Sequence, residues 1–257
     1  MKKKLRRKIV EMITKAGEGH IPSSFSIVDI IYHLYHRHLQ FDAKNPDAPE
    51  RDRFILSKGH GGAALFVVLE EFGFISQKDL ESYGEFEGVL GGHPDRTKVP
   101  GVEASTGSLG HGFPFAVGVA LGQKIRGRKS KTYVLVGDGE CHEGTIWEAA
   151  LAGQNLKLSN LCCIVDYNGS AAQILPHPSI MEQWRAFGWN TIEIDGHHEG
   201  EIDEALSKFI HSNKEKPFAI IAHTTKGKGV SFLESHGPWH HKIPNPQEFE
   251  AIMKELT

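Results

Sequence analysis

The sequence predicts an α/β domain with a mostly parallel central sheet and helices on both faces. In the second half of the chain, short β-branched segments alternate with segments of helical length. Strands joined by helices of this length pair in parallel, because the connection has to return to the end of the sheet from which it started. Two of the strands run into polar clusters, at residues 137–139 and 166–168. Ligands bind beyond the carboxyl ends of such strands, so the sequence predicts a binding site there.

Along the chain, the first helix is predicted by apolar side chains at positions 5, 9, 10 and 13. Ser26 and Asp29 have the spacing of a capping box, which predicts a helix from there through Leu34. The first helix is expected at residues 5–16. Further helices are expected at residues 63–72, 115–125 and 146–156, near Met181 and at 202–211, with a turn-rich loop at 94–106. Strands are expected at residues 132–136, 161–165, 191–194 and 218–222.

Length and composition agree with a single folded unit. The 257 residues fit one domain, covering residues 1–257, that can bury a core without disulfides. A net charge of −3 gives no electrostatic case for a nucleic-acid partner. No apolar run is long enough for a signal peptide or a membrane span. Cys162 and Cys163 are adjacent in an apolar run where reduced thiols are expected, and with Cys141 they favour a cytoplasmic protein.

The turn Gly137-Asp138-Gly139 carries the first chemical signal. Its glycines let the backbone approach a phosphate closely, and Asp138 offers a hard carboxylate oxygen. An Asp-Gly turn alone is common in proteins, but Asn168 follows at the end of the next strand. Neighbouring strand ends bring the two oxygens near one point. Mg2+ takes few oxygen ligands from protein and the rest from phosphates and water, so the pair predicts a metal–diphosphate site.

Short motifs recur along nearly the whole chain, at residues 19–20, 51–54, 57–60, 92–94, 106–110, 137–140, 143–144, 147–149, 160–161, 166–168, 195–197, 225–229 and 239–240. In their residues and their order these motifs resemble the transketolase family. The resemblance implies the thiamine-diphosphate-binding fold.

The resemblance implies a cofactor, thiamine diphosphate, and a metal, Mg2+, with Ca2+ or Mn2+ as substitutes. Asp138, Asn168 and the carbonyl of Ser170 are the implied metal ligands, and Gly139 donates its N–H to the diphosphate. Gly107 and Leu109 are implied to lie along the cofactor's pyrimidine. The expected cofactor-binding residues are His60, Gly107, Leu109, Asp138, Gly139, Asn168 and His240.

Four histidines inside matching motifs are implied to be catalytic. His60 and His240 are expected to line the diphosphate and the reacting carbons. His20 and His93 are expected to hydrogen-bond substrate hydroxyls, a role that suits a group titrating near neutrality. His236 and His241 compete with His240 for the same motif, and that choice stays open. The histidines interpreted as structural or solvent-exposed are His33, His36, His38, His177, His198, His211 and His223.

Two segments depart from the family pattern. His111 stands where the family usually has glutamine. After Asn168 the family commonly continues with a short Gln–Asp–Gly stretch, whereas this chain reads Gly-Ser-Ala-Ala-Gln-Ile at residues 169–174. The family pattern therefore does not fix the metal's backbone ligand or the conformation of the loop over the cofactor in this chain.

The resemblance does not include the glutamate that activates the cofactor's thiazolium in this family. That residue belongs to a second domain, which would follow Thr257 in full-length relatives. Two explanations stay open, a truncated chain and an enzyme split between two genes, and the split enzyme is favoured. The expected partner is a separate C-terminal transketolase subunit carrying the glutamate, with two of each chain in a heterotetramer. Glu143 and Glu148 resemble carboxylates at the family's dimer interface.

The implied activity is that of a transketolase-type transferase. A two-carbon ketol unit would pass from a ketose to an aldose acceptor, with sugars or sugar phosphates as substrates. One alternative is a thiamine-dependent 2-oxo acid decarboxylase or acyl-transferase subunit, against which His20 and His93 argue because they suit sugar hydroxyls. Another is a non-catalytic subunit derived from the fold, against which the intact metal and diphosphate set argues.

Overall fold

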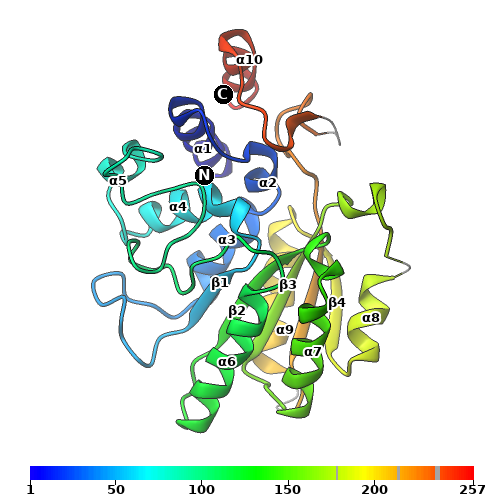
Figure 1. Cartoon of the computed structure of the whole chain (residues 1–257). Coiled ribbons are helices and arrows are strands. Elements are labelled where there is room, and N and C mark those ends of the chain that lie inside the picture. Colours follow the sequence, from blue (N-terminus) through cyan, green and yellow to red (C-terminus); the bar gives the residue numbers. More distant parts are fainter. Residues whose placement is uncertain (178, 213–214, 235–237) are drawn as a thin grey trace.

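A five-stranded parallel sheet forms the centre of the protein (Figure 1). The computed structural model describes the whole chain except residues 178, 213–214 and 235–237. In the described part, the strand order is β1-β2-β3-β5-β4 and every neighbouring pair is parallel. The strands are β1 (Arg53–Leu56), β2 (Thr132–Gly137), β3 (Leu161–Tyr167), β4 (Asn190–Asp195) and β5 (Phe218–His223). The predicted α/β class is therefore confirmed.

Helices cover both faces of this sheet. Successive strand residues point to opposite sides, so Tyr133 and Leu135 enter one core while Val134 and Val136 enter the other. In Figure 1, α6 and α7 lie in front of the sheet and α9 lies behind it. The helices of the first core are α1 (Lys2–Ala16), α2 (Ile21–Phe25), α3 (Val28–His33), α4 (Gly62–Glu71), α9 (Glu199–His211) and α10 (Pro246–Glu255). Those of the second are α6 (Gly112–Ile125), α7 (Gly144–Asn155) and α8 (Ile180–Ala186).

The expected elements all form, within a few residues of their predicted ends, apart from the helix after Ser26. The expected loop at residues 94–106 contains neither helix nor strand. Among the α-helices and strands of the described residues, those not predicted are α2, α5 (Gln77–Glu81), α10 and the edge strand β1. Both α5 and α10 begin with a complete capping box, at Ser76–Asp79 and Asn245–Glu248, so their starts were readable in the sequence.

The predicted capping box at Ser26 and Asp29 is wrong. Ser26 lies at the end of α2, and α3 begins after Ile27 without a side-chain cap. The Asp29 carboxylate is buried and binds the Arg6 guanidinium at 2.9 and 2.7 Å. A buried carboxylate needs a charged partner more than a helix start needs a cap, so the ion pair decides where Asp29 points. The helix also ends early, because Leu34–His38 form a π-helical turn.

The three cysteines lie in the interior as expected. Cys141, Cys162 and Cys163 are free thiols, and burial raises the pKa of each above its ordinary value. Within the described residues, no helix combines the length and the hydrophobicity needed to cross a bilayer.

Candidate active site

Asp138 and Asn168 follow the carboxyl ends of two adjacent strands. Gly137 at the end of β2 pairs with Asp166 near the end of β3, so the residues beyond them meet at one edge of the sheet. Asp138 is 3% exposed. Its Oδ1 accepts the Gly139 N–H at 2.8 Å, and its Oδ2 accepts the Ala171 N–H at 3.3 Å. The carboxylate is thus held in one direction by two backbone groups.

The side chain of Asn168 is also held in one orientation. Its amide nitrogen donates to Asp166 Oδ2 at 2.8 Å, which leaves the amide oxygen as the group turned away from Asp166. That oxygen accepts the Ser170 N–H at 3.0 Å. A carboxylate and an amide oxygen at one edge are the ligand chemistry that Mg2+ takes from proteins. Within the described residues, no cluster of three or more His, Cys, Asp or Glu suited to a metal is present.

Asp166 anchors the floor beneath this edge. It is fully buried and accepts Lys58 Nζ at 2.6 Å and Ser26 Oγ at 2.9 Å, in addition to Asn168 and the Thr224 hydroxyl. Burial opposes its charge, but the Lys58 ammonium and these donors keep the pKa of Asp166 below its ordinary value. Lys58 lies within the motif at residues 57–60, but the resemblance implied no role for its side chain. Its partner is 108 positions away, so only the fold reveals the pair.

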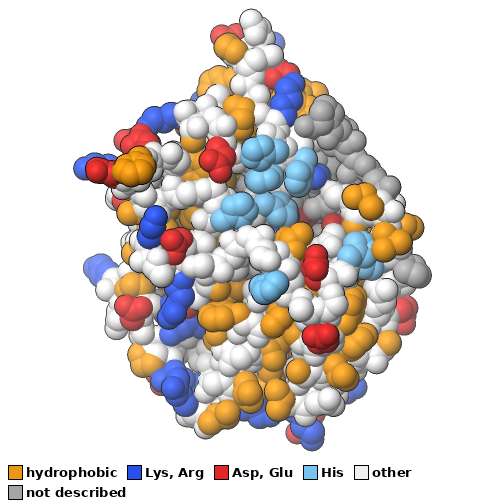
Figure 2. Space-filling view, in the orientation of Figure 1, with side chains coloured by type: hydrophobic (Ala, Val, Ile, Leu, Met, Phe, Trp, Pro, Cys, Tyr) orange, Lys and Arg blue, Asp and Glu red, His pale blue; other side chains and the backbone are white. Residues whose placement is uncertain are grey.

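Histidines from four segments gather above these residues. Figure 2 shows a group of histidine side chains on one face of the molecule. His20 precedes α2, His60 lies in a turn after β1, His93 lies in the loop before α6, and His240 ends the turn Pro238–His240. The ring centre of His20 is 5.4 Å from that of His60, 6.3 Å from that of His93 and 5.1 Å from that of His240. The structure brings together all four histidines predicted to be catalytic.

Burial lowers the pKa of three imidazoles in this cluster, those of His20, His60 and His240. For His20 burial and then His240 lower the pKa to about 4, and for His60 burial and then Lys58 lower it to about 2. Burial and then Lys226 lower the pKa of His240, whose Nδ1 lies 3.1 Å from Lys226 Nζ. At neutral pH the rings of His20, His60 and His240 are therefore uncharged, and each can donate one hydrogen bond and accept another.

The loop at residues 106–110 borders the histidines. A Cβ on Gly107 would lie 3.2 Å from Cδ2 of His93, so the ring of His93 rests against the backbone there. The buried carboxylate of Glu140 fixes the far end of the loop by accepting the Gly110 N–H at 2.9 Å and the Ser57 hydroxyl at 2.5 Å. Leu109 is partly buried, and its carbonyl lies 3.0 Å from Nδ1 of His111. Gly107 thus borders the histidine cluster, and Leu109 follows it in the same loop.

Two interpretations of histidines change with the structure in view. His241 contacts the ring of His20 at 4.7 Å, so it lines the cluster together with His240, while the competing His236 lies outside the described residues. His177 was expected to be structural or exposed, but its Nε2 lies 3.1 Å from the carbonyl oxygen of Asp138. His33 is buried, whereas His211 and His223 are exposed.

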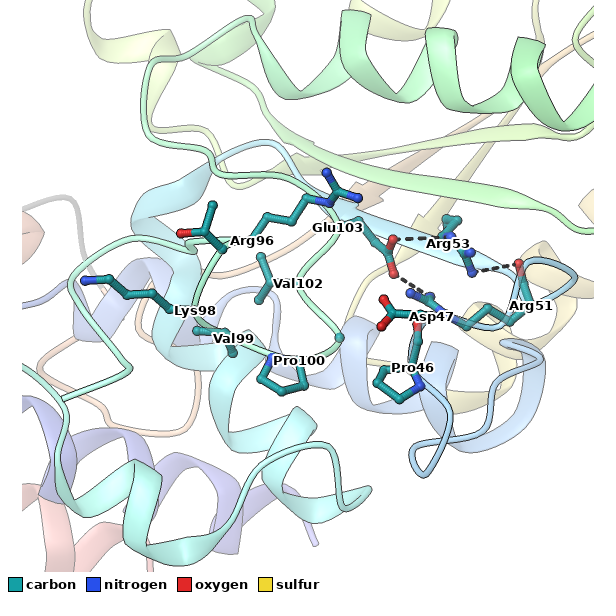
Figure 3. Close-up of a pocket in the computed structure, with 12 residues that line it drawn as sticks. Pro46, Asp47, Arg51, Arg53, Arg96, Lys98, Val99, Pro100, Val102 and Glu103 are labelled. Atoms are coloured by element: carbon teal, nitrogen blue, oxygen red, sulfur yellow. Dashed lines mark hydrogen bonds and ion pairs between the residues drawn. The ribbon is translucent and has the colours of Figure 1, made fainter.

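A separate pocket of about 470 Å³ lies at the amino end of β1 (Figure 3). Arg51 and Arg53 pair there with Glu103, and both also donate to backbone carbonyls, including those of Pro46 and Ala48. Their donors are therefore used in holding the loop before β1. This arrangement is structural, and it lies at the edge of the sheet opposite to Asp138.

Comparisons with known proteins agree with this geometry. Residues 1–248 match the family described as the thiamine diphosphate binding domain of transketolase. An apulose-4-phosphate transketolase subunit of Phocaeicola vulgatus is 41% identical over 259 residues, covering 99% of this chain and 92% of that protein. A 6-deoxy-6-sulfo-D-fructose transketolase subunit from a Clostridium species is 38% identical over 257 residues, covering 98% of this chain and 93% of that protein.

Solved structures agree as well. The transketolase of Campylobacter jejuni superposes with a TM-score of 0.92 at 31% identity, covering 98% of this chain and 41% of that one. The chain spans about two fifths of the length of the solved transketolases that it matches. Fold and comparisons thus define an α/β protein of the thiamine-diphosphate-binding class. The chain belongs to the transketolase family, as the order of its motifs indicated, and the predicted class of enzyme, a transferase, is confirmed.

Proposed function

We propose that this chain binds the diphosphate of thiamine diphosphate through Mg2+ and works as one subunit of a split transketolase. The observation that carries the proposal is the placement of Asp138 and Asn168 beyond adjacent strand ends, with Lys58 binding Asp166 at that edge and acting electrostatically on His60 of the histidine cluster. Bound thiamine diphosphate would supply the electron sink that cleavage of a carbon–carbon bond requires. The activity is transfer of a two-carbon ketol unit from a ketose to an aldose.

The protein's own residues would position and neutralise the diphosphate. Asp138 supplies a charged oxygen to the metal, and Asn168 supplies a neutral one whose direction the buried Asp166 fixes. The carbonyl of Ser170 is proposed as the backbone ligand. Gly139 is proposed to donate its N–H to the diphosphate in place of its present bond to Asp138. Because divalent cations prefer such oxygen ligands, the residues present fit the group.

The histidines would handle the substrate's hydroxyl groups. His20 and His93 are proposed to hydrogen-bond the hydroxyls next to the bond that breaks, and His60 and His240 to line the reacting carbons. An uncharged imidazole can accept a proton from one hydroxyl and donate to another, which a ketose requires when its carbon–carbon bond is cleaved and remade. Lys226, which contacts His240, brings a positive charge to the same rim.

A separate partner chain would complete the site. The two relatives described above are similar to this chain over nearly their whole length, and the chain matches about two fifths of human transketolase. We propose that a second chain provides the missing glutamate, in an assembly with two of each chain in the cytoplasm. Glu143 and Glu148 are exposed, as a contact with another chain requires. Large apolar side chains on α6 and α7 are exposed as well, with Phe115 at 43% and Leu151 at 51%.

The substrate class is proposed from chemistry and from the relatives' names. Those names give apulose-4-phosphate and 6-deoxy-6-sulfo-D-fructose, and each describes a sugar that carries an anionic group. We therefore propose a sugar or sugar-phosphate donor. The test is donor cleavage by the assembled enzyme with thiamine diphosphate and Mg2+, comparing ketose phosphates with 2-oxo acids. Preference for a 2-oxo acid would replace the transketolase proposal with a decarboxylase or acyl-transferase, and addition of a chelator should abolish turnover in either case.

A further inference from the structure

One histidine of the loop between β3 and α8 contacts the turn that contains Asp138. His177 lies near the end of this loop, nine residues after Asn168 in the sequence. Its Nε2 is 3.1 Å from the carbonyl oxygen of Asp138, and its Nδ1 is 3.0 Å from the side-chain oxygen Oε1 of Gln183 on α8. A carbonyl oxygen can only accept, so Nε2 carries the proton and donates it to Asp138. The contact therefore has a defined direction.

A second histidine supports the first. His142 lies in the short turn Glu140–His142, which follows Asp138 and Gly139. Its ring stacks on that of His177 with centres 4.2 Å apart and planes 4° from parallel. Asp138 and His142 thus contact the same imidazole, one through a hydrogen bond at its edge and the other through its face. Both contacts come from the turn that carries the proposed metal ligand.

The large apolar side chains of this loop are exposed. Ala171 is buried and donates its N–H to Asp138 Oδ2, but residues 172 and 174–176 are exposed, with Ile174 at 92% and Leu175 at 60%. Burial of apolar surface therefore does not anchor the segment. Its two contacts with Asp138, through Ala171 at one end and His177 at the other, take that role.

We propose that His177 is a positioning residue that fastens the loop at residues 169–177 onto the Asp138 turn. Fastened in this way, the loop keeps the Ala171 N–H on the Asp138 carboxylate, directs that carboxylate, and helps to retain the diphosphate and its metal. This inference rests on the proposed function for its effect on the cofactor. The fastening itself belongs to the free protein and can be measured without cofactor.

The experiment compares three substitutions at one position. His177→Ala removes the donor, His177→Gln places an amide NH2 near the position of Nε2, and His177→Asn places it near Nδ1, too short to reach Asp138. The first readout is hydrogen exchange at the Ala171 amide in the cofactor-free chain. The second is the calorimetric affinity of thiamine diphosphate with Mg2+ for the assembled enzyme.

The expected result is a matched pair of losses. One hydrogen bond of this kind supports an effect of about 3- to 10-fold, so His177→Ala and His177→Asn should speed Ala171 exchange and weaken cofactor binding by about that factor. His177→Gln should stay within about twofold of the wild type in both readouts. If His177 only filled space, His177→Gln would have no reason to keep wild-type exchange and affinity where His177→Asn loses them.

Three outcomes would overturn the inference. Unchanged exchange in His177→Ala would show that the loop is held by something else. Faster exchange with unchanged cofactor affinity would separate the loop from the cofactor site. Equal behaviour of the glutamine and asparagine variants would remove the directional hydrogen bond from the argument. If the wild-type assembly itself does not bind thiamine diphosphate, the proposed function fails, and the exchange measurement still reports separately on the fastening.

Discussion

The carboxylate of Asp138 and the amide of Asn168 differ in charge, and that difference separates their expected effects. Mutation of a residue that only hydrogen-bonds to a metal ligand already lowers metal affinity by about 10- to 100-fold. Asp138→Ala removes a charged ligand, so cofactor affinity in the presence of Mg2+ should fall by more than about 100-fold. Asn168→Ala should cost about 10- to 100-fold. Calorimetry of the assembled enzyme measures both, with Glu193→Ala, an exposed carboxylate on the edge strand β4, as the control that binds normally.

His93 is exposed at the rim of the cluster and makes its closest backbone approach at Gly107. Because the ring does not fill the core, His93→Ala should fold and bind cofactor normally. Loss of a proton-transferring or hydroxyl-positioning group should lower kcat by about 10²- to 10⁴-fold. Steady-state kinetics on a ketose donor measure this loss. His211→Ala, an exposed histidine at the end of α9, should leave kcat unchanged; a similar kcat for both variants would make His93 a structural residue.

The lowered pKa values of the buried histidines predict how stability depends on pH. An unfolded histidine binds a proton below pH about 6.5, whereas His20 in the folded chain does so only near pH 4 and His60 near pH 2. Between pH 6.5 and pH 4 the unfolded state therefore binds more protons, so the free energy of unfolding falls as the pH falls through that window. Urea titrations of the purified chain should show this fall. His60→Gln, which cannot titrate, should show a flatter profile, and an identical slope would contradict the argument.

At the scale of single residues, local motifs indicated the groups that are proposed to face the cofactor, but not the groups packed behind them. Asp138 and Asn168 could be predicted because each follows a recognisable strand, and the four histidines because each lies within a motif. Lys58, Lys226 and His177 could not, because their significance depends on partners 108, 14 and 39 positions away. Only the fold brings such pairs together. The spacing of Ser26 and Asp29 misled for the same reason, since Asp29 pairs with Arg6 across 23 positions.

At the scale of elements, capping chemistry is reliable only where the cap is exposed. Asn245 caps the start of α10: its side-chain oxygen accepts the Glu248 N–H at 2.9 Å. In return, the backbone N–H of Asn245 donates to the Glu248 carboxylate. Asn245→Ala should therefore lower the free energy of unfolding by about 1 kcal/mol, the typical worth of such a cap. Ser26→Ala provides the contrast, because its hydroxyl contacts Asp166 and caps no helix.

Denaturant titrations and exchange measurements separate these two cases. The asparagine variant should lose protection only along α10. The serine variant should instead disturb the surroundings of Asp166. If Ser26→Ala instead loses protection along α3, the predicted capping box at Ser26 and Asp29 would be supported after all.

Over the whole molecule, the regular alternation of strands and helices made the sheet predictable, and its buried strands match their expected positions closely. The edge strand β1 was not predicted because it has only four residues and begins at Arg53, the last residue of the charged run Arg51-Asp52-Arg53. Exposure is not the reason, because Phe54, Ile55 and Leu56 are buried, whereas the predicted edge strand β4 is mostly exposed or half-buried. The same sheet brings the carboxyl ends of β1, β2 and β3 to one edge, which gathers His60, Asp138 and Asn168 from three separate segments.

The final prediction is that this chain turns over no sugar by itself and gains activity from a second polypeptide. Its site supplies groups for a diphosphate, a metal and sugar hydroxyls. The buried carboxylates nearest to that site are already committed: Asp166 to Lys58, and Glu140 to Ser57 and Gly110. Neither is free to bind the aminopyrimidine of the cofactor. Donor cleavage should therefore be absent with this chain alone, absent with the partner alone, and restored by the mixture.

The stoichiometry of the active mixture can be measured by light scattering, and two of each chain are expected. Glu143→Lys, which reverses an exposed charge at the proposed contact, should shift the assembly toward smaller species and reduce turnover together. Robust turnover by the single chain would refute the divided site, because it would require an activating carboxylate within these 257 residues. A mixture that assembles and binds thiamine diphosphate but cleaves neither ketoses nor 2-oxo acids would instead favour a non-catalytic subunit, since cofactor binding and chemistry would then have separated.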